Sequence, residues 1–527
     1  MNNRKQIIKF IISLCLSLLS ILAINSCQTN NRNQPPKIFS DNNIRIGISS
    51  ENLILEPDIK FLVQKATKKN VEIVTKGSVS LTELACKGEL DAIAIADEMW
   101  PNIKCPDAGW VDTSGSLYQT RIQFALPTTT AQQLGWDNRV VSRQEVLTAL
   151  QSGKLNLATT IPTYSNSGYN TLLWLAREAI SSNLAPEQIT PEALAPLQPI
   201  YQNLAQKSES TAYLAQKLSE QWQPNTLAAL YRFLYSPDGK ALYYRGQKLP
   251  LAEPVTFIEV TPAVTVTPTW FVTIKDEQLR QQLIERVFNQ LESKNPNTFA
   301  RLRQLNPPTE ANVTKEATPV AEVHRRLLDS FHPSIRQKRW IIGIIDASAS
   351  MQGEGYSQLL AAFEQLLLPE LAKANFLYSP SDRFNLVVYQ GNRAYSIPDN
   401  LETANNPQVR ESLYSSLKNK VKPSGGTPVD LGLLEGFKTA LEIPDEFQLE
   451  VFLFTDGQFS NPVDTELLEL HRQLEQRNAE LTIVGAGDVR DRQLITLADE
   501  LNARPIVSQD ANQTLDELLK AFREAQI

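Results

Sequence analysis

The chain has 527 residues, which is too long for one ordinary hydrophobic core and is typical of about three domains or lobes. Its hydrophobic content of 42% and charged content of 21% are those of a globular protein, and its net charge of −7 argues against a nucleic-acid-binding protein. The three histidines, His324, His332 and His471, are scattered, which weighs against a histidine metal cluster and against a Ser-His-Asp hydrolase.

Residues 1–26 have the pattern of a targeting segment. A basic stretch at residues 4–9 precedes an apolar run at residues 11–24, which is shorter than the roughly 20 residues of a membrane-spanning helix. Ile-Asn-Ser-Cys at residues 24–27 then resembles the lipobox of bacterial lipoproteins, with Asn25 as a less usual spacer. The resemblance implies cleavage before Cys27 and lipidation of Cys27. An uncleaved N-terminal anchor and an ordinary secretory signal peptide are the alternatives.

Residues 27–42 have the composition of a tether. They are polar and contain Pro35 and Pro36, which favours disorder. Several acyl chains on Cys27 would anchor such a tether stably, where one chain would not. The N-terminal region therefore predicts a protein of the cell envelope, held on a bacterial membrane and facing the periplasm or the exterior.

Strand-like and helix-like segments alternate from residue 43 to about residue 308. Strands are predicted at residues 44–48, 71–75 and 90–96, with helices between them. A long middle section has its own strand at residues 155–159, and residues 255–274 are again rich in strand formers. Alternation at this spacing predicts an α/β fold with parallel sheets.

The order of these segments resembles the type II periplasmic solute-binding proteins. The resemblance rests on Ser49 and Ser50 after the first strand, on residues 163–168 before a helix, and on residues 304–307 after the last helix. It implies two lobes with a cleft between them, one formed by residues 43–126 and 255–308 and the other by residues 127–254.

The stretch Ser165-Asn166-Ser167-Gly168 resembles the loop with which anion-type solute receptors hold an oxyanion. Free backbone N–H groups and the helix dipole favour an anion at such a helix start. The alternative is an ordinary helix cap, because Ser and Asn are preferred there in all proteins. No basic residue near these loops stands out as a counter-charge. The ligand-binding residues expected for a small solute or an oxyanion are Ser49, Ser50, Ser165, Asn166 and Ser167.

Cys86 and Cys105 remain when the two N-terminal cysteines are set aside. In an exported chain they are either disulfide partners or two small buried residues, and their spacing does not decide between these alternatives.

A linker is predicted at residues 309–324 from its Pro, Thr and Ala content, and a C-terminal domain at residues 325–527. A short helix at residues 323–331 would lead into this domain. Basic residues around the helix form either a solvated face or a surface for a partner or lipid headgroup: Arg325, Arg326, Arg336, Lys338 and Arg339.

The C-terminal domain alternates strands and helices regularly. Its central strands are apolar without alternation, which is typical of a sheet covered on both faces and predicts a doubly wound α/β domain. Asp346-Ala-Ser348-Ala-Ser350 follows the strand at residues 340–345, Gly-Gly-Thr427 precedes a helix, and Asp456 follows the strand at residues 449–454.

These three stretches, in this order, resemble the metal-ion-dependent adhesion site of the von Willebrand factor type A family. Mg²⁺ prefers about six oxygen ligands. The resemblance implies that Ser348, Ser350 and Thr427 bind Mg²⁺ (or Mn²⁺) directly, that Asp346 and Asp456 hold metal-bound waters, and that one position stays open for a carboxylate of a partner. The alternative is that all five side chains only cap loops and neighbouring helices.

The sequence favours a binding protein over an enzyme, because no residue of this set is a nucleophile activated by a base. The first hypothesis is a lipid-anchored extracytoplasmic protein that captures an acidic group of a partner protein through the metal ion. The alternative is a solute receptor of an ABC-type importer with the C-terminal domain as an accessory. A metal chelatase component would sit beside an ATPase, and the chain has no Gly-x-x-x-x-Gly-Lys-[Ser/Thr] loop.

Overall fold

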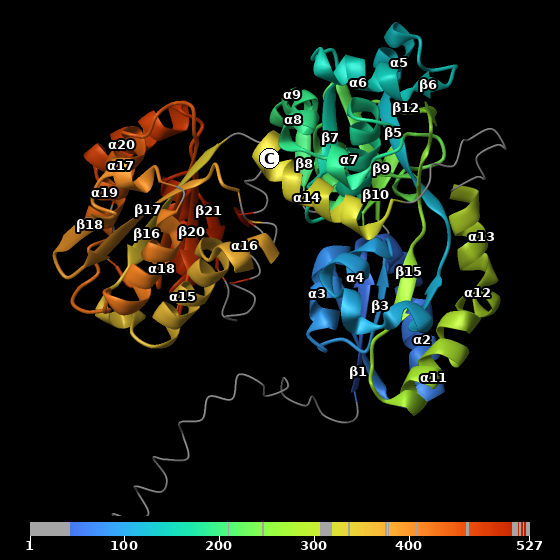
Figure 1. Ribbon diagram of the computed structural model, residues 1–527, viewed down its shortest axis with the longest axis horizontal. Helices are drawn as coiled ribbons and strands as arrows, with labels where there is room; N and C mark the ends of the chain where they lie inside the picture. Colours follow the sequence, from blue (N-terminus) through green and yellow to red (C-terminus); the bar gives the residue numbers. More distant parts are fainter. Residues whose placement is uncertain are drawn as a thin grey trace, which may run out of the picture.

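The computed structural model forms two α/β lobes followed by a separate α/β domain (Figure 1). The predicted signal peptide, Cys27 and the tether lie outside the described residues. No helix in the described part of the chain is long and apolar enough to cross a membrane. The structure describes residues 43–527 except 209, 245–246, 306–318, 336–337, 375–376, 378, 407, 460–462, 488, 508–514, 516–517, 520 and 523–527.

The outer lobe has a five-stranded sheet in which β15 runs antiparallel to its neighbours β3 and β4. β15 is antiparallel because the chain returns here from the other lobe. The sheet order is β2 (Asn70–Lys76), β1 (Asn43–Ser49), β3 (Ala92–Ile95), β15 (Thr269–Val272) and β4 (Ser114–Ser116). Its helical segments are η1 (Ser50–Leu55), α2 (Glu56–Thr67), α3 (Ser78–Cys86), α4 (Met99–Lys104), α11 (Glu277–Arg286), α12 (Leu291–Lys294) and α13 (Pro296–Leu305).

The inner lobe surrounds a second sheet and the almost fully buried helix α7 (Asn166–Ala179). The sheet order is β12 (Val255–Ile258), β5 (Thr120–Pro127), β9 (Thr226–Tyr231), β7 (Asn156–Thr160) and β8 (Gln206–Ser208), with β14 (Val264–Val266) also paired to β5. Its other main helices are α5 (Thr128–Leu134), α6 (Arg143–Gln151), α8 (Pro191–Leu194), α9 (Gln198–Gln202) and α10 (Thr211–Glu220). Two small sheets pair β10 (Ala241–Tyr244) with β11 (Gln247–Pro250) and β6 (Val141–Ser142) with β13 (Val260–Thr261).

The chain crosses between the lobes at residues 117–119 and 267–268. The sequence placed the crossings at residues 126–127 and 254–255. Strands β5, β12 and β14 belong to the inner-lobe sheet because β12 and β14 each pair antiparallel with β5, which also pairs with β9 of that sheet. The periodicity of apolar residues predicts a strand but not the strands beside it. The true crossing positions therefore became visible only from the strand pairing in the structure.

Helix α14 (Ala321–Ile335) packs against the first domain, although the sequence assigned its residues from 325 onward to the C-terminal domain. Its apolar side chains share one hydrophobic cluster with both lobes, and it contacts α4 of the outer lobe as well as α8 and α9 of the inner lobe (Figure 1). Phe331 meets the ring of Tyr201 edge-on at 5.2 Å, and His324 is hydrogen-bonded to the hydroxyl of Tyr169. The first domain therefore extends to residue 335.

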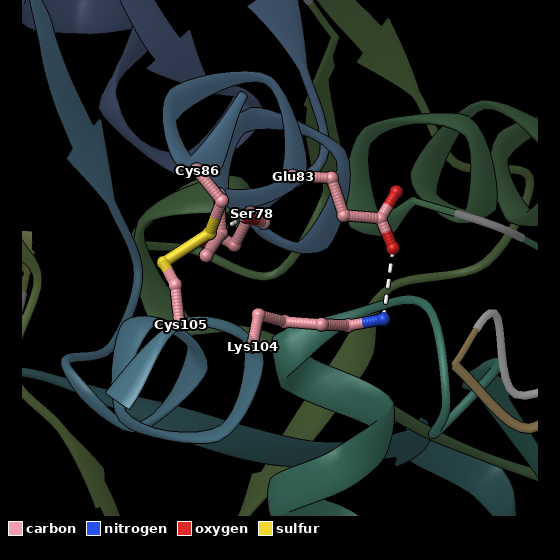
Figure 2. Close-up of a disulfide and its surroundings, with 6 residues drawn as sticks. Ser78, Glu83, Cys86, Lys104 and Cys105 are labelled. Atoms are coloured by element: carbon pink, nitrogen blue, oxygen red, sulfur yellow. Dashed lines mark hydrogen bonds and ion pairs between the residues drawn. A yellow bond between two sulfur atoms is a disulfide. The ribbon is translucent and has the colours of Figure 1, made fainter. Parts of the chain in front are cut away.

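The outer lobe contains a disulfide between Cys86 and Cys105, at the C-terminal ends of α3 and α4 (Figure 2). The Lys104 ammonium and the Glu83 carboxylate form an ion pair of 2.8 Å beside it. Closing a loop of this length stabilises a fold by about 3 kcal/mol.

The C-terminal domain has a doubly wound sheet, as the sequence predicted. The strand order is β18 (Arg393–Ile397), β17 (Arg383–Gln390), β16 (Arg339–Asp346), β19 (Gln448–Thr455), β20 (Glu480–Gly485) and β21 (Arg504–Ile506), parallel except for the edge strand β18. One face is covered by α15 (Glu354–Leu367) and α18 (Val409–Asn419), and the other by α19 (Val429–Leu441), α20 (Thr465–Gln476) and α21 (Asp491–Glu500). The shorter helices are α16 (Pro369–Ala374) and α17 (Leu401–Ala404).

Candidate metal site and interlobe cleft

The sheet of the C-terminal domain creates a crevice between β16 and β19. The chain runs from β16 outward to β17 and β18, and then returns to β19 and runs outward the other way to β20 and β21. In doubly wound sheets, ligands bind at such a switch point, outside the carboxyl ends of the strands. Asp346 is the last residue of β16 and Asp456 directly follows β19, so the fold brings these two acids to that crevice.

Asp346 is fully buried and holds two neighbouring loops. Its Oδ1 accepts a hydrogen bond of 2.9 Å from the Ser348 amide, and its Oδ2 accepts one of 2.7 Å from the Thr455 hydroxyl. Burial raises the pKa of Asp346, hydrogen bonds from Ser348 and Thr455 lower it, and the nearby Asp456 raises it. The two acids therefore lie close enough to repel each other.

The hydroxyls of Ser348 and Ser350 lie 3.0 Å apart, the first buried and the second exposed, so they lead outward from Asp346. The glycine-rich loop before α19 is bonded to the Asp346 loop, because the Ala349 amide donates to the Gly425 carbonyl over 3.1 Å. Gly425 has a φ of +76°, and a Cβ there would lie 2.7 Å from Gly391 Cα. This close approach to the turn between β17 and β18 favours glycine at position 425, and Thr427 of the same loop is partly exposed.

The hydrogen bonding of Asp456 indicates whether this site fits a divalent cation. Its Oδ1 accepts from the Gln458 amide at 2.9 Å, but its Oδ2 is buried with no hydrogen-bond partner in the described part of the chain. A buried carboxylate oxygen without a partner is costly. Among the described residues, no three His, Cys, Asp or Glu side chains converge on a metal position. Two acids with neighbouring hydroxyl oxygens fit a hard cation such as Mg²⁺.

Two further residues of this site were not assigned a role from the sequence. Thr455 bonds Asp346 through its hydroxyl, which also accepts from the Gly457 amide at 3.2 Å. Tyr389 lies opposite Asp346 in the β16–β17 register, and its buried hydroxyl has no hydrogen-bond partner among the described residues. Burial and the Asp346 carboxyl raise the pKa of Tyr389 well above its ordinary value. The sequence signal for both residues was a hydroxyl side chain near the carboxyl end of a strand next to β16, Tyr389 in β17 and Thr455 in β19.

The cleft between the two lobes of the first domain is closed by buried polar contacts. Trp100 of the outer lobe donates through Nε1 to Asn166 Oδ1 at 3.2 Å, and Asn166 Nδ2 donates to the Tyr231 hydroxyl at 3.0 Å. η1 of the outer lobe, which follows Ser49, packs against α10 of the inner lobe. Of the predicted cleft residues, Ser49 and Asn166 therefore lie on opposite lobes.

The start of α7 is polar and buried but does not have the ordinary cap that was the alternative. Ser165 makes no side-chain cap hydrogen bond. Ser167 instead bonds the hydroxyls of Thr160 and Thr211, each at 2.7 Å. Ser50, the remaining predicted ligand, is only partly buried in η1. The predicted residues Ser165, Asn166 and Ser167 thus gather at the interlobe face of the inner lobe, where Thr211 joins them.

A cavity of about 320 Å³ lies between the lobes, next to α14. Its wall includes Asp97 of the outer lobe, Trp174 of the inner lobe, Thr267 of the crossing strands and His324 of α14. Removal from water raises the pKa of Asp97 to about 6 and lowers the pKa of His324 to about 4. These residues carry no local sequence signal, because they come from four separate segments.

Residues 341–521, about a third of the chain, match the model of the von Willebrand factor type A domain family. No relative among the curated proteins matches the chain. The chain is similar in structure to the periplasmic binding protein AfuA from Actinobacillus pleuropneumoniae, solved with fructose-6-phosphate bound, at 12% identity and a TM-score of 0.38, over 56% of this chain and 99% of that chain.

Two further solved structures are similar to this chain. The periplasmic molybdate-binding protein of Azotobacter vinelandii has 11% identity and a TM-score of 0.32, over 50% of this chain and 97% of its own. The von Willebrand factor type A protein from Catenulispora acidiphila has 18% identity and a TM-score of 0.29, over 37% of this chain and 44% of its own. The two-lobed description of the first domain rests on its own strand order and its two crossings.

Proposed function

We propose that this chain, which carries a von Willebrand factor type A domain at its C-terminal end, is an extracytoplasmic binding protein. Its C-terminal domain captures an acidic group of a partner protein through Mg²⁺ or Mn²⁺, and Cys27 anchors the chain to a membrane. The disulfide between Cys86 and Cys105 supports this location, because disulfides persist in oxidising compartments outside the cytoplasm.

The observation that carries the proposal is the buried Asp456 Oδ2, which has no hydrogen-bond partner in the described part of the chain and lies close to a second buried acid. Ser348, Ser350 and Thr427 would offer hydroxyl oxygens to the ion, while Asp346 and Asp456 would hold its waters and balance its charge. A bound Mg²⁺ or Mn²⁺ supplies an electrophilic centre that accepts a carboxylate oxygen. We assign the site no catalytic role, because the exposed Ser350 hydroxyl is bonded to Ser348 and, among the described residues, to no base.

The test compares Asp456→Asn with the matched control Asp445→Asn, whose side chain is 94% exposed. Electron paramagnetic resonance of Mn²⁺ should show one bound ion per wild-type or Asp445→Asn chain and weaker binding by Asp456→Asn. Envelope proteins recovered with the full-length chain in Mg²⁺ should be lost with EDTA and with Asp456→Asn. Recovery that neither treatment changes would contradict metal-dependent capture.

The interlobe cavity favours a second candidate function, the binding of a small solute. A cavity of about 320 Å³ between two lobes is at the lower end of the size of small-molecule sites. On this proposal the chain is the receptor of an ABC-type importer, with the C-terminal domain as an accessory. Mass spectrometry of small molecules that copurify with the full-length chain tests it, because a receptor retains a defined solute and a purely structural domain retains none.

A further inference from the structure

The interlobe cleft contains buried hydrogen-bond acceptors that the protein leaves without donors. Glu51 is 4% exposed and its Oε2 has no hydrogen-bond partner among the described residues; Asn52 is fully buried and its Oδ1 likewise has none. Both residues belong to η1, which packs against α10 across the cleft. Leaving such acceptors unsatisfied destabilises the fold, and more so for a charged group.

The Glu51 side chain faces the inner lobe. It reaches the hydroxyl of Tyr231, at the end of β9, which in turn accepts from Asn166 at the start of α7. The pKa of Glu51 is raised, above all by burial, while hydrogen bonding from Ser49, Ser50 and Tyr231 lowers it only in part. The carboxyl group is therefore held in the cleft without enough donors for its charged form.

A second acid, Asp97, follows β3, and the charges of Glu51 and Asp97 both act on Tyr231. Asp97 lines the cavity, as does Arg177 of the inner-lobe helix α7, and the charge of Asp97 also acts on Tyr169 of the inner lobe. The charged group that acts on Asp97 is another acid, Glu98. Neither Glu51 nor Asp97 forms an ion pair with a described residue. The outer-lobe side of the interlobe space is thus acidic.

We infer that the interlobe space receives a small solute through a protonated amine, and that Glu51 contacts this group. The inference rests on the second candidate function, the binding of a solute by the first domain. An amine brings both the hydrogen-bond donors and the positive charge that the buried acceptors lack. An oxyanion, which the sequence also predicted as a ligand, would find the cation Arg177 in the wall of the cavity, but at Glu51 it would meet a desolvated carboxyl group.

A divalent metal ion is the other cation that two acids could attract. It prefers about six oxygen ligands around one position. A protonated amine needs only two or three acceptors in one place, which Glu51, Asn52 and the neighbouring Ser49 hydroxyl provide.

The experiment titrates the purified full-length chain by calorimetry and follows its thermal unfolding. The probes are 1,4-diaminobutane, 4-amino-1-butanol and the neutral 1,4-butanediol, which share one carbon skeleton, together with molybdate and fructose 6-phosphate. We expect the two amines to bind and to raise the unfolding temperature, while the diol and both anions do not. Glu51→Gln, which keeps the shape of the side chain, should weaken amine binding about 10- to 100-fold.

Glu187→Gln is the matched control, because Glu187 is an exposed acid of the same domain. It should bind the amines as wild type does. Anion binding by wild type would overturn the inference and leave solute binding standing, whereas failure of all probes would count against both. Amine binding that Glu51→Gln leaves unchanged would also overturn it. The measurements on the wild-type chain distinguish amines from anions even if Glu51→Gln does not fold.

Discussion

Buried acids lie at both ends of the strand pair β16 and β19, but among the described residues only those at the amino end are paired with a cation. At the amino end, the Arg339 guanidinium lies 3.1 Å from Glu450 and 3.1 Å from Asp382, and all three side chains are at most 1% exposed. At the carboxyl end, Asp346 and Asp456 are as deeply buried, yet neither forms an ion pair with a described residue. The same pair of strands thus carries compensated acids at one end and uncompensated acids at the other.

The difference separates charges that hold the fold together from charges that await a ligand. A buried acid without a cation lowers stability unless something binds to it. The interlobe cleft repeats the uncompensated arrangement with Glu51 and Asp97, whereas Arg339, which the sequence grouped with basic residues near α14, is fully buried. The protein therefore has two regions whose buried acids are unpaired among the described residues, one in each domain.

The largest expected effect is at the compensated end. Arg339→Met should lower the free energy of unfolding of the C-terminal domain by about 3–5 kcal/mol, because it leaves Glu450 buried without its cation and Asp382 with only Arg410, 3.9 Å away. Arg472→Met removes a pair whose arginine is 63% exposed and should cost less than about 1 kcal/mol. Calorimetric unfolding of both variants measures this, and equal losses would remove the distinction.

A substitution in α14 shows which domain is stabilised by the packing of this helix. Phe331→Ala should lower the free energy of unfolding of the first domain by about 3 kcal/mol, because Phe331 is fully buried in the cluster shared with the two lobes. The exposed Leu468→Ala in α20 should cost less than about 1 kcal/mol. A loss confined to the C-terminal transition would return α14 to the domain that the sequence assigned.

The acidic interlobe space predicts a pH dependence. Because the folded pKa of Asp97 is about 6 and the unfolded one about 4, the folded chain binds more protons between these values. Stability should fall as pH rises through that window and stay lower above it. Asp97→Asn should therefore be more stable than wild type by on the order of 1–3 kcal/mol at pH 7 and equal to it near pH 4.

The comparison with wild type is needed because His324, whose folded pKa is lowered to about 4, changes stability in the opposite direction over the same window. His324 is present in both proteins, so its contribution cancels in their difference. Urea unfolding at pH 4, 5, 6 and 7 gives that difference. A gap between the two proteins that does not vary with pH would show that Asp97 is not held at a raised pKa.

The smallest effect on stability is expected at the exposed edge of the candidate metal site. Ser350→Ala should change the free energy of unfolding without metal by less than about 0.5 kcal/mol, because Ser350 is exposed, and should weaken Mn²⁺ binding about 10-fold. Ser357→Ala, another exposed serine nearby in the chain, should change neither quantity. Titration of Mn²⁺ by paramagnetic resonance measures the binding, and equal affinities for the two variants would exclude Ser350 as a ligand.

The sequence predicted the α/β class, the doubly wound C-terminal domain and the three stretches that meet at its crevice. It could do so because apolar runs ending in polar residues are local patterns, and carboxyl ends of parallel strands meet at one edge. It did not predict that Thr455 bonds Asp346, since 109 residues separate them. The lobe crossings were misplaced because antiparallel pairing is not visible in a single strand.

The sequence by itself determined where the strands end and which polar side chains follow them, because the repeat of apolar residues sets both. Only the tertiary structure decided which buried charges are compensated. Arg339 meets Glu450 across 111 residues, and Glu51 meets Tyr231 from the opposite lobe. Such contacts depend on how separate elements pack, and burial then makes a carboxylate either part of a stable network or an acceptor that needs a ligand.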